Sequence, residues 1–309
     1  MSGRLGRLAR YLNFTLRPAI SVPTFAAQGA GLYGALELLA GEPLHLGWRF
    51  ALTAAVSYGL MVLIRLYDEL KDADHDLARA AEGDPEYLDR PIVTGALRVE
   101  DVAWGRRWLE PALWILALPL GWVGYGAFAV AFAVTWLSFK WFFWPAVQTN
   151  RLLALLTHLP VYFFVVSGLF GGTFAGSRGL EAIGWPGAAL LVGLWLANGI
   201  WETARKIRLP EEESGFQSYS SMIGWRPALI LPAAFTVAAL SLSIWGAAAV
   251  TPPGWRVAVG GAGVGYLGFI ALLALRPSRA LRALLRPLAE GLLALLWVGL
   301  PLALWWGCR

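Results

Sequence analysis

Cysteine, histidine and charge are all scarce in this sequence of 309 residues. The one cysteine is Cys308, which excludes an intramolecular disulfide and a cysteine-ligated metal site. The three histidines, His45, His75 and His158, are scattered and exclude a multi-histidine zinc centre or a di-haem centre. Charged residues make up only 15% of the chain and hydrophobic residues 58%, which excludes an ordinary water-soluble domain.

Long soluble segments are missing as well. Apolar runs near the 20-residue length of a membrane span recur along the whole chain, separated by Gly-, Pro- or charge-rich breaks. Such runs satisfy their backbone as helices, so we predict a single all-α membrane domain over residues 1–309, with about nine transmembrane helices. The predicted spans are 20–39, 48–67, 103–121, 124–143, 153–174, 185–204, 227–249, 255–275 and 287–306.

Positive charge is distributed unevenly around these spans. The N-terminal segment and four connections hold 21 of the 25 basic residues. Lysine and arginine concentrate on the cytoplasmic side of membrane proteins, so these segments are predicted to face the cytoplasm, the first of them as an interfacial basic helix. No basic stripe is interleaved with exposed aromatic residues, and nucleic acid is therefore not an expected partner. The four connections are 65–107, 140–151, 205–226 and 276–286.

A row of acidic residues follows the second predicted span. Asp68, Asp72 and Asp76 recur every fourth residue, so they share one face of a helix, while His75 faces away. Carboxylates at this spacing repel one another, and a bound cation would relieve that repulsion. Oxygen ligands beside a membrane suggest Mg²⁺, which prefers a few carboxylates together with waters and substrate phosphates. The alternative is a solvated acidic loop.

A second polar cluster ends the sixth predicted span. Asn198, Glu202 and Lys206 are again four residues apart and line one helical face. Asn198 and Glu202 lie near the hydrocarbon boundary, where an ionisable residue indicates a functional site by default. The alternative for Lys206 is a side chain that snorkels to the interface. The segment from Gly215 to Gly224 then carries Ser and Tyr hydroxyl groups just before the next span.

Two such clusters suit the binding of a lipid diphosphate. The acidic row would bind Mg²⁺, the metal would hold the diphosphate, and nearby arginines and lysines would take up the remaining phosphate charge. Departure of the diphosphate would leave an allylic carbocation, which aromatic faces can stabilise. The aromatic candidates, each of which could equally serve packing, are Phe139, Phe142, Phe143, Trp144, Tyr162, Phe163 and Trp201.

The acidic row also carries a resemblance to a known family. Asp68-Glu69-x-x-Asp72-x-x-x-Asp76 is similar to the first motif of the UbiA superfamily of intramembrane prenyltransferases, N/D-D-x-x-D-x-x-x-D, with Glu in place of the second acid. The D-R-P that often follows this motif in the family is echoed by Asp89-Arg90-Pro91. The nine-span layout agrees with the family, so the resemblance covers nearly the whole chain.

The second cluster resembles the family less closely. The second motif, D-x-x-x-D, matches at Glu202, while Lys206 stands where the second Asp is usual. The family's K-S/T-rich run ending in glycine is similar to residues 217–224. The Y-x-x-x-K pair that is common after the fourth span is missing from Trp144-Pro-Ala-Val-Gln148-Thr-Asn-Arg151. The number of metal ions and the acceptor are therefore left open.

The resemblance implies an Mg²⁺-dependent enzyme that transfers a prenyl group from an isoprenyl diphosphate donor to a lipophilic acceptor among membrane lipids. It implies a helical bundle around a central cavity with a cytoplasmic cap, in a bacterial inner membrane, with the site facing the cytoplasm. Catalytic roles are implied for Asp68, Asp72, Asp76, Glu202 and Lys206, the first four as metal ligands. Substrate-binding roles are implied for Arg17, Arg90, Gln148, Arg151, Asn198, Arg205 and Tyr219.

Three other functions fit parts of the pattern. A membrane terpene cyclase would ionise the same diphosphate without an external acceptor. A CDP-alcohol phosphotransferase needs a D-G-x-x-A-R signature, and no such string precedes Asp72. A transporter places its polar residues near the midplane, whereas here they gather at one face of the membrane.

Overall fold

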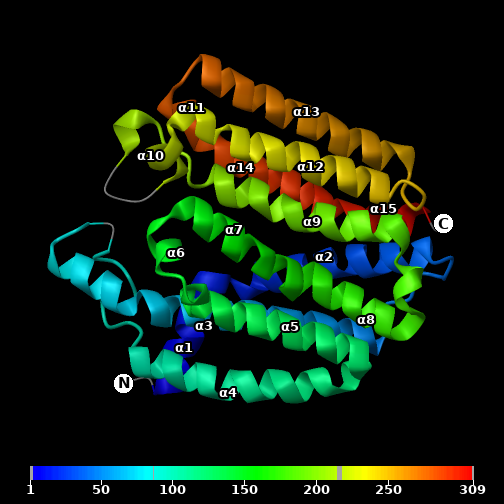
Figure 1. The fold of residues 1–309 in the computed structure, drawn as a ribbon, viewed down its shortest axis with the longest axis horizontal. Helices are drawn as coiled ribbons and strands as arrows, with labels where there is room; N and C mark the ends of the chain where they lie inside the picture. Colours follow the sequence, from blue (N-terminus) through cyan, green and yellow to red (C-terminus); the bar gives the residue numbers. More distant parts are fainter. Residues whose placement is uncertain (1–2, 86, 214–217, 308–309) are drawn as a thin grey trace.

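The computed structural model describes residues 3–85, 87–213 and 218–307, and this part of the chain is helical without strands (Figure 1). Gly215 to Gln217 of the predicted Gly-to-Gly segment and Cys308 lie outside the described residues. The first helices are α1 (Arg4–Leu16), α2 (Pro18–Leu39), α3 (Trp48–Ala81), α4 (Val99–Ala117), η1 (Leu118–Leu120), α5 (Gly121–Phe139), η2 (Trp141–Phe143), α6 (Pro145–Thr149), α7 (Arg151–Tyr162), η3 (Phe163–Gly168) and α8 (Leu169–Arg178). They are followed by η4 (Leu180–Ala182), α9 (Gly184–Ala204), η5 (Pro210–Glu212), α10 (Tyr219–Ile223), α11 (Trp225–Ala228), α12 (Ile230–Gly246), α13 (Pro253–Leu275), α14 (Arg279–Trp297) and α15 (Gly299–Gly307).

Six helical stretches of the described chain are long and apolar enough to cross a membrane. This finding agrees with the predicted polytopic membrane protein. The six stretches are Trp48–Ala81, Val99–Phe139, Arg151–Arg178, Trp225–Gly246, Pro253–Leu275 and Arg279–Gly307.

The predicted count of nine spans is not confirmed. The stretch Val99–Phe139 contains two predicted spans, and it turns back on itself between α4 and α5, where Gly121 has a φ of 78° (Figure 1). Helices α2 and α9 cover two further predicted spans but are not among the six. Both contain polar side chains that neighbouring helices cover, such as the buried Gln28 and the half-buried Asn198.

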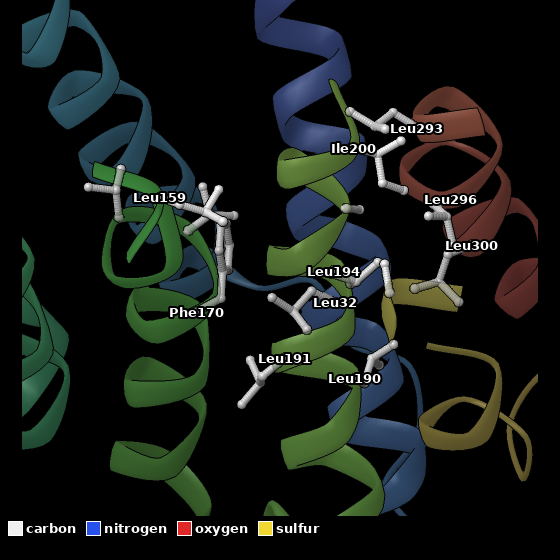
Figure 2. Close-up of a cluster of buried hydrophobic side chains, with 14 of the residues drawn as sticks. Leu32, Leu159, Phe170, Leu190, Leu191, Leu194, Ile200, Leu293, Leu296 and Leu300 are labelled. Carbon is white, nitrogen blue, oxygen red and sulfur yellow. The ribbon is translucent and has the colours of Figure 1, made fainter. Parts of the chain in front are cut away.

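The core of the bundle is aliphatic and joins helices that are distant in the sequence. Figure 2 shows Leu32 of α2, Leu194 and Ile200 of α9, Leu296 of α14 and Leu300 of α15 in one buried cluster. Each of these side chains is at most 1% exposed. The cluster places α9 in the interior, in contact with both α2 and α14.

Helix α9 packs against α12 with very little space between the two backbones. A Cβ atom added at Gly193 would lie 2.5 Å from Oγ of Ser243, and one at Gly246 would lie 2.6 Å from the carbonyl oxygen of Pro186. Small residues allow helices to approach this closely, which is the usual basis of packing in a membrane. The position of α9, whose last turn carries Glu202, is therefore fixed by close packing against α12.

Helix α3 is much longer than a membrane is thick. Its 34 residues extend over about 51 Å, against about 30 Å for the hydrocarbon core. A helix that begins at one interface with Trp48 therefore leaves the hydrocarbon near the start of the acidic row. Figure 1 shows the connections after α3, α5, α9 and α13 at one end of the bundle, which is the end reached by the acidic row.

The N-terminal helix α1 is bound to the rest of the protein. Arg7 makes two hydrogen bonds of 2.6 and 2.7 Å to the carboxylate of Asp101 on α4. The Tyr11 hydroxyl donates a 2.6 Å hydrogen bond to Glu69 on α3. A helix is thus present where the interfacial basic helix is predicted, and its polar side chains connect it to α3, which carries the acidic row, and to α4.

Candidate active site

The acidic row lies on the outer half of α3. Asp68 pairs with Lys71, with 2.8 Å between Oδ1 and Nζ. Asp76 is buried, and its Oδ2 lies 3.9 Å from Nε of Arg90 in the connection after α3. Asp72 makes no hydrogen bond or ion pair with any residue that the structure describes. Asp72 is thus the carboxylate of the row that has no direct ion pair, although the charge of Lys71 acts on it.

The row suits a metal ion only when a substrate completes the coordination. Among the described residues, no group of three or more His, Cys, Asp and Glu side chains is placed to hold a metal by itself. Mg²⁺, however, is commonly bound by one or two carboxylates, with waters and substrate phosphates as its other ligands. The unpaired Asp72 supplies such a ligand, with Asp68 and Asp76 one turn away on either side.

Both oxygens of the Glu202 carboxylate are paired with basic side chains of the same chain segment. Its Oε1 lies 2.5 Å from Nζ of Lys206, and its Oε2 lies 2.6 Å from Nη2 of Arg205. Lys206 is largely buried, and burial lowers the pKa of its ammonium group while Glu202 opposes that effect. The Asn198 amide donates to carbonyl groups of its own helix at 3.1 and 3.4 Å.

Helix α7 brings the two clusters to a common region. Tyr162 interacts electrostatically with both Asp68 and Glu202, which come from α3 and α9. His158, one turn earlier on the same helix, interacts with Asp68 and with Lys206. Residues of the acidic row and of the second cluster are therefore both near the same part of α7.

A break in the helix positions this part of α7. Residues Phe163–Gly168 form a π-helix directly after α7, and Pro160 within α7 has no N–H to donate. Side chains from neighbouring helices bond to carbonyl groups near the break: Trp195 of α9 donates to Leu159 at 2.8 Å, and Ser57 of α3 donates to Val165. The break is thus held by the same two helices that carry the charged clusters.

Two predicted substrate-binding residues join the second cluster. Arg151, in the first turn of α7, interacts electrostatically with Lys206. Tyr219 is fully buried, its ring centre lies 5.8 Å from Nζ of Lys206, and its backbone N–H donates to the Lys206 carbonyl at 3.2 Å. Arg151, Arg205 and Lys206 make this end of α9 a positively charged region, and Tyr219 packs against it.

Two other predicted residues are not brought to the site. Arg17 is exposed at the turn between α1 and α2, with a left-handed φ of 47°. Gln148 is exposed on α6. Within the described residues, neither makes a hydrogen bond or ion pair with the acidic row or with the second cluster. Their predicted roles remain predictions.

The sequence interpretation included neither Lys71 nor His158 among the site residues. Lys71 is largely buried and lies 4.4 Å above the Trp141 ring, and its spacing of three residues from Asp68 was an available signal. His158 has Nδ1 at 3.1 Å from the Ala154 carbonyl, and it interacts electrostatically with Asp68 and Lys206. His75 is exposed and packs edge-on against Tyr87.

Comparison with known proteins identifies the fold. A solved structure of a digeranylgeranylglyceryl phosphate synthase in membranes matches 97% of this chain over 99% of its own, with a TM-score of 0.57 and 13% sequence identity. That synthase is an intramembrane prenyltransferase of the UbiA superfamily. The chain shares the fold of that synthase. Comparison of sequences alone finds no matching family model and no similar curated protein.

Proposed function

We propose that the protein transfers a prenyl group from an isoprenyl diphosphate to a lipophilic acceptor within the membrane. The proposal is supported by the electrostatic proximity of α7 residues to both an anionic face of α3 and a cationic end of α9. The shared fold with a prenyl-transferring synthase supports the same reaction class.

The charges of the two faces suit the two parts of a metal–diphosphate substrate. Residues 65–76 contain five acidic and two basic side chains, whereas residues 198–208 contain one acidic and three basic side chains. Bound Mg²⁺ would neutralise diphosphate charge, and Asp72, together with Asp68 or Asp76, would hold it along with substrate phosphates and waters. Arg205 and Lys206 would bind phosphate oxygens directly, because charge-assisted hydrogen bonds to phosphate are among the strongest in proteins.

The reaction then breaks the bond between the allylic carbon and the diphosphate oxygen. The electron pair leaves with the diphosphate, which the basic residues hold, and the allylic cation accepts an electron pair from the acceptor, which loses a proton. Tyr162 is half-buried and interacts electrostatically with residues of both clusters, so its ring is a candidate to stabilise the cation.

Product analysis tests the proposal. Purified protein would be incubated with labelled isoprenyl diphosphates of several lengths, Mg²⁺ and a membrane lipid extract. We expect label to move into a lipid that carries the prenyl group, and transfer to stop when a chelator removes the metal. A labelled hydrocarbon formed without any extract would instead indicate a terpene cyclase. Intact diphosphate in every mixture would contradict both.

A further inference from the structure

The feature that carries a further inference is the Glu202 carboxylate at the end of α9. Both of its oxygens are paired with cations, Oε1 with Lys206 at 2.5 Å and Oε2 with Arg205 at 2.6 Å. Two positive groups therefore meet one negative group, and the cluster has a net positive charge. Such a cluster attracts an anion and repels a metal ion.

We infer that Glu202 binds no metal in this protein, that it holds Lys206 and Arg205 in place to receive the diphosphate, and that the site consequently takes one divalent cation, on α3. The inference rests on the proposed function. It differs from the ligand set that the UbiA resemblance implies, in which Glu202 is a fourth metal ligand.

The surroundings of Lys206 keep it at this position. Its side chain is only 13% exposed, and its ammonium group lies against the ring of the buried Tyr219. The backbone carbonyl of Lys206 accepts the Tyr219 N–H at 3.2 Å, which fixes the segment after α9. A metal ion on Glu202 would have to displace an ammonium group that has little room to move.

The opposite face shows the contrasting arrangement. Asp72 lacks an ion-pair partner among the described residues, whereas Glu202 has two cations within 2.6 Å. The two faces are thus matched to different parts of one substrate: α3 to the metal, and the end of α9 to the phosphate oxygens. Lys206 stands where the second motif of the family usually has an acid, so its ammonium supplies positive charge at the place where an acid would recruit a second ion.

Metal counting tests the inference without measuring turnover. The detergent-purified full chain would be titrated with Mn²⁺ in the presence of farnesyl thiolodiphosphate, a donor analogue that resists ionisation, and bound Mn²⁺ would be counted by electron paramagnetic resonance. We expect one ion per chain in the parent protein and in Glu202→Gln. Asp72→Asn should lose the ion, and Lys206→Asp should gain a second one.

The outcomes separate the inference from the proposed function. Two ions in the parent, or loss of an ion in Glu202→Gln, would overturn the inference and leave prenyl transfer intact. No binding of Mn²⁺ or analogue to the parent would overturn the proposed function itself.

A second measurement covers the case in which Lys206→Asp does not fold. Inorganic diphosphate would be titrated in excess chelator, where only protein cations can bind it. Lys206→Met should weaken this binding by about tenfold or more, as expected for loss of one charge-assisted contact. Lys140→Met, which removes an exposed lysine that faces Phe139, should bind as the parent does. Equal affinities in the Lys206→Met variant and the parent would contradict the inference.

Discussion

Each aspartate of the acidic row meets a different environment although all three have the same helical spacing. Asp68 has Lys71 at 2.8 Å, and Asp76 is buried with Arg90 at 3.9 Å. Asp72, between them, has no ion-pair or hydrogen-bond partner in the part of the chain that the structure describes. The negative charge of the row is therefore least compensated at its centre, and Asp72 is the residue from which most metal affinity should come.

Replacement of that carboxylate should abolish transfer while the protein remains folded. Asp72→Asn is nearly isosteric and removes like-charge repulsion along α3, so the apo protein should be equally or slightly more stable, by a few tenths of a kcal/mol. Activity with labelled donor and the melting temperature in detergent measure the two effects. Asp74→Asn, an exposed change on the same helix, serves as the control. Normal turnover in Asp72→Asn would indicate instead that the row is a solvated acidic surface without a role in catalysis.

Lys71 should oppose metal binding in the parent protein. Its ammonium competes for Asp68, and two unit charges about 4 Å apart interact by about 1 kcal/mol even in water. Lys71→Met keeps most of the apolar contact with Trp141 and removes the charge, so half-maximal activity should require roughly fivefold less Mg²⁺. A titration of activity against Mg²⁺ measures this shift. An unchanged or higher requirement would show that Lys71 does not face the metal.

At the scale of elements, the site depends on how closely helices approach one another. The π-helix Phe163–Gly168 is held by α3 and α9, and α9 is in turn held against α12 through Gly193. A displacement of α9 would move Glu202 and would also withdraw Trp195 from the Leu159 carbonyl. The geometry of both clusters is therefore set by packing that lies well inside the bundle.

A single methyl group at this contact should be enough to separate the two helices. Gly193→Ala places a Cβ 2.5 Å from Ser243 Oγ and 2.7 Å from its backbone nitrogen, and overpacking of this kind costs about 1–3 kcal/mol. We expect a lower melting temperature and weaker binding of donor. Gly265→Ala on α13, where a Cβ meets no atom within 4 Å, is the matched control and should melt at or above the temperature of the parent. Equal melting of both variants would contradict the close contact.

Viewed as a whole molecule, the protein has its charged connections at one end of the bundle (Figure 1). The distribution of lysine and arginine predicts that this end faces the cytoplasm. Single cysteines would be introduced in a Cys308→Ser background, with Lys140→Cys and Arg276→Cys at the charged end and Glu181→Cys at the opposite end. All three positions are exposed.

An impermeant maleimide should then label Glu181→Cys in intact cells and the other two only in inverted membrane vesicles. The opposite pattern would reverse the orientation. Labelling of Lys140→Cys and Arg276→Cys from different sides would contradict the single polar end of the bundle.

Residue patterns that repeat along a single helix could be predicted from the sequence, whereas side-chain contacts between different helices could not. The four-residue spacing of Asp68, Asp72 and Asp76 identified a helical face, and apolar runs located the long helices. The bond from Tyr11 to Glu69 joins residues 58 positions apart, and no local pattern encodes it. The Glu202 pairs are different, because Arg205 and Lys206 lie three and four residues after Glu202 and this local spacing does favour ion pairs on a helix. The sequence interpretation used that spacing only to identify a common face.

The attachment of α1 has a consequence for the order in which the chain can assemble. Helix α1 is synthesised before α3 and α4, and its two polar anchors, Glu69 and Asp101, follow 58 and 94 residues after their partners Tyr11 and Arg7. Until then α1 has only the membrane surface to bind, where a basic amphipathic helix is stable. The contacts that join α1 to α3 and α4 can therefore all form only after α4 has been made. The acidic row reaches its final surroundings at that stage, although its residues come early in the sequence.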